Sequence, residues 1–301
     1  MRRLLTGLSV IFLLLFNTLI LIGPLLLIAL GKFVLPGKAL KTASSRGVMW
    51  VAETWAEINK LIFAALLPVR WDIRGSADLR PSTSYLVISN HQSWVDIPAL
   101  VQAFNRKTPY FKFFLKQELI WVPFLGLAFW ALDYPFMKRY SKAFLAKHPH
   151  MQGKDLEITK QACEKFKDLP VTVVNYLEGT RFTPAKQAQQ GSPFQYLLKP
   201  KAGGVAFVLA ALGEQLDTVL DVTLVYPGAR IPGFWALISG QVDKVIVDIQ
   251  TRELDPALWQ GDYENDPNFR QFVQNWVNTL WEDKDARIAQ IRAELSTPTH
   301  G

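Results

Sequence analysis

The 301-residue sequence predicts an α/β fold: a mixed, mainly parallel sheet flanked by helices, preceded by an N-terminal two-helix membrane motif. After residue 68, short β-branched runs alternate with segments of helical character, an order typical of parallel strands joined by helices. Before residue 68, a long uncharged run precedes an amphipathic segment, which is typical of membrane attachment. We therefore expect membrane-attachment helices at 1–67, an α/β domain at 68–250 and a helical region at 251–301.

The composition favours a partner with an anionic surface. Half of the residues are hydrophobic, ten are tryptophan, and the net charge is +7. That charge suits phospholipid headgroups. No zinc-finger spacing, RNA-binding aromatic signature or long basic tract accompanies it, so we do not expect a nucleic-acid partner.

Cysteine and histidine usage gives no sign of a metal site. Cys163 is the only cysteine, which excludes an internal disulfide and a cysteine cluster for zinc. His148 and His150 lack carboxylate or thiolate residues at ligand spacing, and a solvated loop is the simpler interpretation. We expect no metal and no bound cofactor.

The first apolar run, Leu4 to Gly31, contains no charged residue. As a helix it would be about 42 Å long, against a hydrocarbon core of about 30 Å. It is too long for a cleaved signal peptide, and no Ala-x-Ala site follows it. Basic residues flank it on both sides, and the positive-inside rule would place both flanks in the cytoplasm: Arg2, Arg3, Lys32, Lys38, Lys41 and Arg46. Because Gly23-Pro24 interrupts the run, we expect a shallow or re-entrant segment, with a single span as the alternative.

The second helix is predicted over Val48 to Leu67. Glu53, Glu57 and Lys60 fall on one stripe, and apolar residues occupy the remaining surface. This profile fits a helix lying in a membrane interface, and it fits equally a helix packed on the domain core.

Strands and helices then follow in alternation, and β-branched and aromatic runs bounded by turn residues mark the strands. Strands are expected at 69–73, 85–88, 110–115, 171–177, 219–225 and 244–249, and helices at 94–104, 154–168, 204–212 and 267–293. The apolar segment Leu119 to Leu132 is broken by Pro123 and Gly126. We expect a helix half-sunk in the bilayer beside the site.

The run Ile88 to Asp96 contains the candidate catalytic residues. It brings His91 to a polar turn after a strand, and Asp96 follows on a helix-like segment. A histidine can act as a general base, and a carboxylate can orient it. Neither a serine-hydrolase elbow nor a cysteine lies beside them, so the attacking hydroxyl would come from the substrate.

The spacing of the two residues restricts their geometry. On one continuous helix they would point about 140° apart, so His91 must lie on the turn before the helix. Two structural alternatives need no catalysis: His91 caps a turn, or Ser93 to Asp96 is a capping box.

Four further segments follow in order: Lys116 to Gly126, Phe136 to Arg139, Tyr176 to Arg181 and Asp221 to Pro227. With His91-x4-Asp96, this set resembles the 1-acylglycerol-3-phosphate acyltransferases, within the wider glycerolipid and lysophospholipid acyltransferase family. The last segment is similar to the form in the branch that includes lysocardiolipin acyltransferases.

The resemblance implies that His91 is the base, that Asp96 orients it, and that a second group of residues binds the substrate phosphate: Glu178, Gly179, Thr180, Arg181 and Arg139. A glycine lets backbone approach a phosphate, while threonine and arginine supply donors. Further candidates for substrate binding are Lys116, Asn90, Gln92, Lys199 and Lys201. Asn90 and Gln92 would either shape the turn or polarise a thioester carbonyl.

Three positions depart from the family pattern. Asp133 stands where glycine is common, Leu177 where proline is common, and Asp221-Val-Thr replaces a proline-rich stretch. These changes leave the base and its carboxylate in place and bear on the choice of acceptor.

The expected function is membrane-bound transfer of a fatty acyl group from acyl-CoA or acyl carrier protein to the free hydroxyl of a lysophospholipid. Lysophosphatidic acid is the default acceptor. The alternatives are a larger-headgroup acceptor, such as lysophosphatidylglycerol or lysocardiolipin, and a catalytically idle lipid-binding protein of the same fold. Because both thioester donors are cytosolic, we expect a bacterial inner membrane with the site on its cytoplasmic face.

Overall fold

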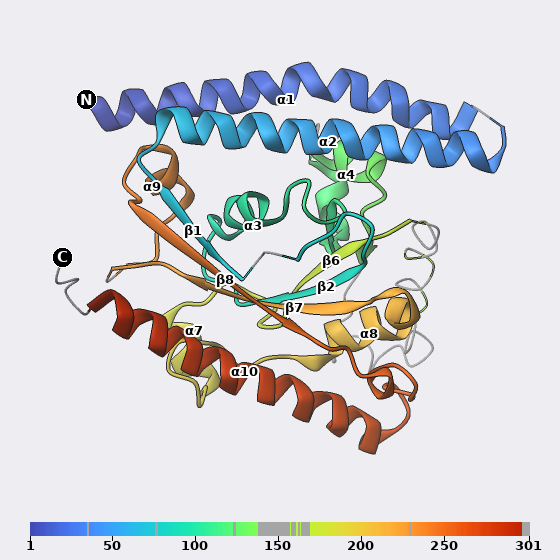
Figure 1. Ribbon diagram of the computed structural model, residues 1–301, viewed down its shortest axis with the longest axis vertical. Coiled ribbons are helices and arrows are strands. Elements are labelled where there is room, and N and C mark those ends of the chain that lie inside the picture. The colour runs from blue at the N-terminus through green and yellow to red at the C-terminus, as the bar shows by residue number, and fades with distance from the viewer. Residues whose placement is uncertain are drawn as a thin grey trace.

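The computed structural model describes residues 1–34, 36–75, 78–122, 125–137, 157, 161, 163, 169–228 and 230–296. The helix expected at 154–168 lies almost wholly outside these residues, as does Arg139. Figure 1 shows a central sheet with helices on both faces and a pair of long helices along one side of the molecule.

The main sheet has the order β1-β8-β7-β2-β6-β3. Its strands are β1 (Arg70–Arg74), β2 (Tyr85–Ser89), β3 (Phe111–Phe113), β6 (Thr172–Tyr176), β7 (Thr218–Val225) and β8 (Lys244–Arg252). Neighbouring strands are parallel except β7 and β8. The prediction of a mixed, mainly parallel sheet is therefore confirmed. A separate two-stranded pairing joins β4 (Leu115–Lys116) to β5 (Phe136–Met137).

Alternate residues of the central strand β2 face two different cores. Leu86 and Ile88 pack with α8 (Ala202–Leu212) and α10 (Pro267–Ser296) on one face. Tyr85 and Val87 pack on the other face with α3 (Asp96–Phe104), and that core also includes α9 (Phe234–Ile238). A parallel strand buried on both sides needs a nearly continuous apolar run, as this segment has. Shorter helices complete the described chain: η1 (Gln117–Trp121), α4 (Leu125–Ala131), α7 (Pro184–Gln190), η4 (Gly213–Gln215) and η5 (Pro256–Leu258).

The long helices α1 (Arg2–Val34) and α2 (Lys38–Leu66) run antiparallel across the α3 side of the domain (Figure 1). Among the described residues, one helical segment, 2–32, is long and apolar enough to cross a membrane. The expected interruption at Gly23-Pro24 is wrong, because α1 continues through Pro24. One reason is that α2 packs alongside α1 over most of its length, so tertiary contacts support the helix on both sides of the proline.

Helix α2 begins at Lys38, earlier than the predicted Val48. Its polar stripe packs on the domain: the Glu57 carboxylate accepts a hydrogen bond from Asn105 Nδ2 at 2.8 Å. The same helix leaves Trp50 and Leu61 exposed. Packing on the core and an apolar outer surface therefore occur together in α2.

Among the described residues of the apolar segment 119–132, residues 125–131 form an α-helix. The segment rests on α1, where Lys32 Nζ donates to Ala131 O at 3.0 Å and pairs with Asp133 at 2.6 Å. Asp133 has φ +56°, the left-handed backbone for which glycine is usually chosen. Aspartate tolerates this conformation better than most residues, and here its carboxylate also holds α1.

A buried ion pair attaches α10 to the sheet and accounts for Asp221 in the fourth motif. Lys284 is fully buried; its Nζ contacts the Asp221 carboxylate and donates to Val222 O at 2.7 Å. The other Asp221 oxygen accepts from Arg252 Nε at 3.0 Å. Removing one member of such a pair leaves a buried charge without compensation.

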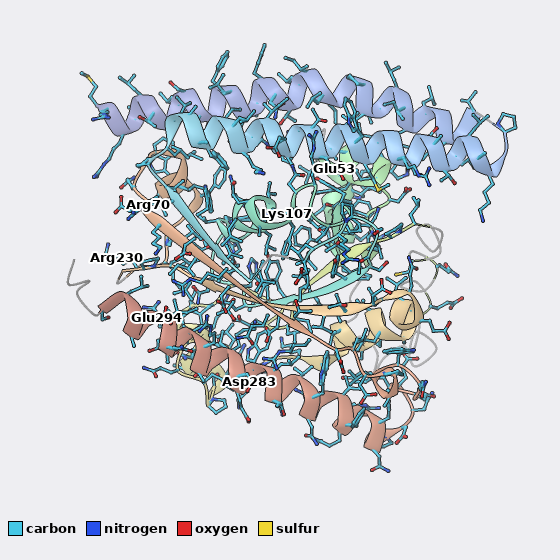
Figure 2. The ribbon with its side chains drawn as sticks, viewed as in Figure 1. Glu53, Arg70, Lys107, Arg230, Asp283 and Glu294 are labelled. Atoms are coloured by element: carbon cyan, nitrogen blue, oxygen red, sulfur yellow. The ribbon has the colours of Figure 1, made fainter. Side chains whose placement is uncertain are left out.

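We predict that Asp221→Ala lowers the free energy of unfolding by about 3–5 kcal/mol, because Lys284 loses its counter-charge. The matched control is Asp283→Ala. Asp283 also pairs with Arg252, at 3.0 Å, but lies half-exposed on α10 (Figure 2). Its loss should cost under about 1 kcal/mol. Chemical unfolding in detergent checks both, and equal losses would contradict the assignment.

Candidate active site

The candidate site lies at the edge of the sheet where three parallel strands end. Residues 90–93, here named the histidine turn, follow β2. Ser89, the last residue of β2, pairs with Tyr176 of β6 on one side and with Val222 of β7 on the other. The segments that follow β6 and β7 therefore meet the histidine turn, at the edge where open α/β sheets commonly place ligands.

His91 and Asp96 are in contact. His91 Nδ1 lies 2.7 Å from Asp96 Oδ2, and the same oxygen accepts from the backbone N–H groups of Gln92 at 2.7 Å and Ser93 at 2.9 Å. Asp96 begins α3 and reaches back to the turn, as the five-residue spacing requires. The carboxylate thus contacts the imidazole and also accepts from Ser93 N, which is one of the two hydrogen bonds of the predicted capping box; the Ser93 hydroxyl accepts from Val95 N instead of Asp96 N.

The contact sets the tautomer of His91. An ionised carboxylate only accepts hydrogen bonds, so the Nδ1 proton lies towards Asp96 and Nε2 is left as the acceptor. The His91 side chain is 19% exposed while Asp96 is fully buried. The imidazole ring also stacks on the Tyr176 ring, with centroids 4.1 Å apart. These contacts fix the orientation of the imidazole ring.

The nearby serine does not provide a free nucleophile. The Ser93 hydroxyl donates to Pro232 O at 2.5 Å and accepts from Val95 N at 3.0 Å. Ser93 is buried. A base with an orienting carboxylate and no available serine suits a reaction in which the substrate brings its own hydroxyl.

Tyr226 makes a contact with Asp96 that the sequence did not reveal. It follows β7, is fully buried, and its hydroxyl donates to Asp96 Oδ1 at 2.5 Å. Burial, followed by the negative charge of Asp96, raises the pKa of Tyr226 well above its usual value, so the hydroxyl stays protonated. The only sequence signal is a tyrosine at the end of a strand in the fourth motif.

Glu178 supports the histidine turn through a hydrogen bond to its backbone. It is fully buried, and its carboxylate accepts from His91 N at 3.0 Å and from Leu198 N at 3.3 Å. Burial raises the pKa of Glu178 to about 8, against the opposing effect of these backbone donors. The resemblance implied a phosphate contact for this residue. In the structure this carboxyl is buried and holds the backbone of the turn.

Gly179, Thr180 and Arg181 lie beside the turn. Gly179 has φ +68° and donates to Tyr176 O at 2.9 Å, a turn that favours glycine. The Arg181 guanidinium lies over the Trp94 ring, 4.6 Å from its centroid. The next residue, Phe182, donates its N–H to His91 O at 2.7 Å. The arginine is therefore tied closely to the segment that carries the base.

Lys186 on α7 adds a cation that the sequence analysis missed. Its Nζ contacts Thr180 Oγ1 at 2.7 Å and Arg181 O at 3.0 Å. It is half-buried and lies five residues beyond Arg181. Only the turn into α7 brings it back to the motif, which is why its position gave no sequence signal.

The remaining candidates have different surroundings. Asn90 is buried and clamps β7: Nδ2 donates to Leu224 O at 2.9 Å, and Leu224 N donates to Oδ1 at 2.8 Å. This leaves Asn90 shaping the turn. Gln92 is also buried, and its Oε1 has no hydrogen-bond partner among the described residues. Lys199 and Lys201 are exposed on the approach to α8, and Lys116 lies on β4.

A family model described as acyltransferase matches residues 70–227, more than half of the chain. The chain is 25% identical over 185 residues to the 1-acyl-sn-glycerol-3-phosphate acyltransferase gamma of Homo sapiens, covering 58% of this chain and 44% of that protein. It is 25% identical over 249 residues to lysocardiolipin acyltransferase 1 of Mus musculus, and this alignment covers 78% of this chain and 61% of that protein. The chain thus spans about half the length of these relatives.

The fold also matches a solved structure, the 1-acyl-sn-glycerophosphate acyltransferase PlsC from Thermotoga maritima. The TM-score is 0.51 at 20% identity, over 93% of this chain and 98% of that one. A match over nearly all of both chains supports the likeness in fold. Together with the family model, which covers the histidine turn and the segments after β6 and β7, it leads to one conclusion: the chain belongs to the acyltransferase family.

Proposed function

We propose that this protein transfers a fatty acyl group from acyl-CoA or acyl carrier protein to the free hydroxyl of a lysophospholipid, with lysophosphatidic acid as the default acceptor. The observation that carries the proposal is the 2.7 Å contact between His91 Nδ1 and a fully buried Asp96, with no free serine beside it. Membership of the acyltransferase family supports the reaction class.

In the proposed reaction, His91 Nε2 removes the proton from the acceptor hydroxyl as its oxygen attacks the thioester carbonyl. The C–O bond forms and gives a tetrahedral intermediate. Its collapse breaks the C–S bond, and the leaving thiolate takes the proton from the imidazolium. Asp96 stabilises that imidazolium and keeps the ring oriented, as a carboxylate does in a serine-hydrolase triad.

The proposed phosphate site uses donors beside the histidine turn. Arg181, held over Trp94, supplies a rigid fork that matches a phosphate, and Lys186 adds charge next to it. Gly179 and Thr180 complete this loop. Arg139 stays a proposal from the motif alone, because it lies outside the described residues.

A larger-headgroup lysophospholipid is the second candidate acceptor. Lysocardiolipin acyltransferase 1 of Mus musculus aligns with 78% of this chain at 25% identity. A relative named for a larger-headgroup acceptor therefore supports keeping this candidate. Turnover across a panel of lysophospholipids and both thioester donors separates the two. Failure with every acceptor would instead favour the idle lipid-binding alternative.

We further propose that α1 and α2 lie along the membrane surface rather than across it. The domain contacts α1 near both ends: the Trp235 ring packs against Gly7, and Lys32 pairs with Asp133. These two points are about 38 Å apart along a helix. A perpendicular span would draw polar domain surface into the bilayer, at high cost. The outer apolar side chains include Leu8, Phe12, Leu15, Leu19, Leu27 and Leu30.

The active site would then face the cytoplasm, where both thioester donors occur. We propose the cytoplasmic face of a bacterial inner membrane, since basic residues flank α1 on both sides. Trp121 and Trp130 are further exposed apolar side chains, on the segment that rests on α1.

We predict that His91→Ala lowers the turnover number by about 10²–10⁴, because the general base is lost. Asp96→Asn should also reduce turnover severely, since it removes the charge that stabilises the imidazolium. Turnover of purified, membrane-bound protein is the measurement, with His148→Ala as the control histidine. Near wild-type turnover in folded His91→Ala protein would refute the mechanism.

Arg181→Ala should raise the Michaelis constant for the lysophospholipid more than that for the thioester. The loss of a charge-assisted hydrogen bond is worth about 1.5–3 kcal/mol. Arg270→Ala is the matched control, since Arg270 also stacks on an aromatic ring, that of Tyr263 near the start of α10. An effect confined to the thioester would move Arg181 to the donor site.

Cysteines placed at residues 2 and 41 test the membrane arrangement. For helices lying along the cytoplasmic surface, neither should react with an impermeant thiol reagent in intact cells, and both should react after permeabilisation. The unmodified chain, with buried Cys163 alone, gives the background. Labelling of only the residue-2 cysteine from outside would indicate a full span.

A further inference from the structure

The Asp96 carboxylate is a buried charge that is compensated by hydrogen bonds. Among the described residues, Oδ2 receives three donors, from the His91 ring and the backbone of Gln92 and Ser93. Oδ1 receives a single donor, the hydroxyl of Tyr226. A buried carboxylate of this kind depends on every donor, because each one replaces water.

The backbone near Tyr226 is fixed by further hydrogen bonds, which keep its hydroxyl in position to donate to Asp96. Two residues earlier, Leu224 makes both backbone hydrogen bonds to the side chain of Asn90, in the histidine turn. The end of β7 is therefore joined to the turn twice, through Asn90 and through the Tyr226 hydroxyl. Tyr226 is 1% exposed, so it has no direct access to a substrate.

We propose that Tyr226 is a positioning residue, which fixes Asp96 and limits how strongly that carboxylate favours the imidazolium form of His91. The claim about rate rests on the proposed acyl transfer, whereas the claim about His91 titration does not.

The physical reason is the sharing of the carboxylate's charge. A strong donor on Oδ1 draws electron density away from Oδ2, and so weakens the attraction of Oδ2 for the protonated ring. Without the hydroxyl, Oδ1 is buried and unsatisfied, and the imidazolium is left as the main compensation. His91 would then keep its proton to higher pH and would serve less well as a base.

The other groups around His91 stay unchanged when Tyr226 loses its hydroxyl. The Tyr176 ring stacks on the imidazole, Glu178 accepts from His91 N, and Arg181 lies over Trp94, the residue that follows the turn. Across the sheet, Lys284 and Asp221 are paired with each other. A change in His91 titration in Tyr226→Phe protein is therefore attributable to the lost hydroxyl.

The test compares Tyr226→Phe with wild type by NMR titration of ¹³C-labelled histidine in detergent. The chain has four histidines, and the spectrum of His91→Ala protein assigns the His91 signal. We expect the midpoint of the His91 titration to rise by about half to one pH unit in Tyr226→Phe. A shift of this size corresponds to part of the free energy of one charge-assisted hydrogen bond. An unchanged midpoint in folded Tyr226→Phe protein would overturn the proposal.

Kinetics give the second measurement. Tyr226→Phe should lower kcat about tenfold at neutral pH, shift the acidic limb of the pH profile upward, and leave both KM values within about twofold. The matched control is Tyr134→Phe. Tyr134 is also buried and donates to Phe111 O at 2.8 Å, so this variant removes a comparable hydrogen bond with no contact to Asp96. It should leave the titration and the pH profile unchanged.

A double variant tests whether Tyr226 acts through Asp96. In an Asp96→Asn background, removing the hydroxyl should cause little further loss, because the two changes break one interaction. A full tenfold further loss would overturn the proposal. A shifted His91 titration in a protein without any acyl transfer would sink the proposed function and support the role of Tyr226.

Discussion

The site depends on the stabilisation of one buried negative charge, the carboxylate of Asp96. A carboxylate fully removed from water needs donors of good geometry, and here they come from the histidine turn and from the end of β7. Each donor fixes the segment that supplies it. The path of the turn, the tautomer of His91 and the position of Tyr226 are consequences of satisfying the same two oxygens.

A second carboxylate lies under the same turn in a different environment. Among the described residues, Glu178 accepts from two backbone N–H groups, and burial raises its pKa to about 8, so near neutral pH it is largely protonated. Asp96 has four hydrogen-bond contacts among the described residues, and one of them is with the imidazole itself. Two carboxylates that contact the histidine turn thus have separate tasks, one electrostatic and one structural, and their environments make the difference.

Local patterns predicted the sheet and the His91–Asp96 pair, because strand periodicity and a five-residue spacing are properties of the sequence itself. They missed contacts that only the fold creates. Tyr226 is 130 residues from Asp96, and Glu178 is 87 residues from the backbone it holds. The continuity of α1 through Pro24 was missed for the same reason, since its support comes from the packing of α2. The family resemblance implied a phosphate contact for Glu178, whereas the fold buries its carboxyl against the backbone of the histidine turn.

The same contacts connect the turn to the N-terminal helices. Ser93 in the turn bonds to Pro232, the loop continues into α9, and Trp235 of α9 packs against Gly7 of α1. A short series of contacting residues therefore connects the base to helix α1, which carries the apolar surface. Under the proposed function and membrane arrangement, an acceptor with its acyl chain in the bilayer and its hydroxyl at the surface would meet the base without leaving the membrane. A water-soluble thioester carries its acyl group on a polar carrier, and so fits an approach from the aqueous side of the same sheet edge.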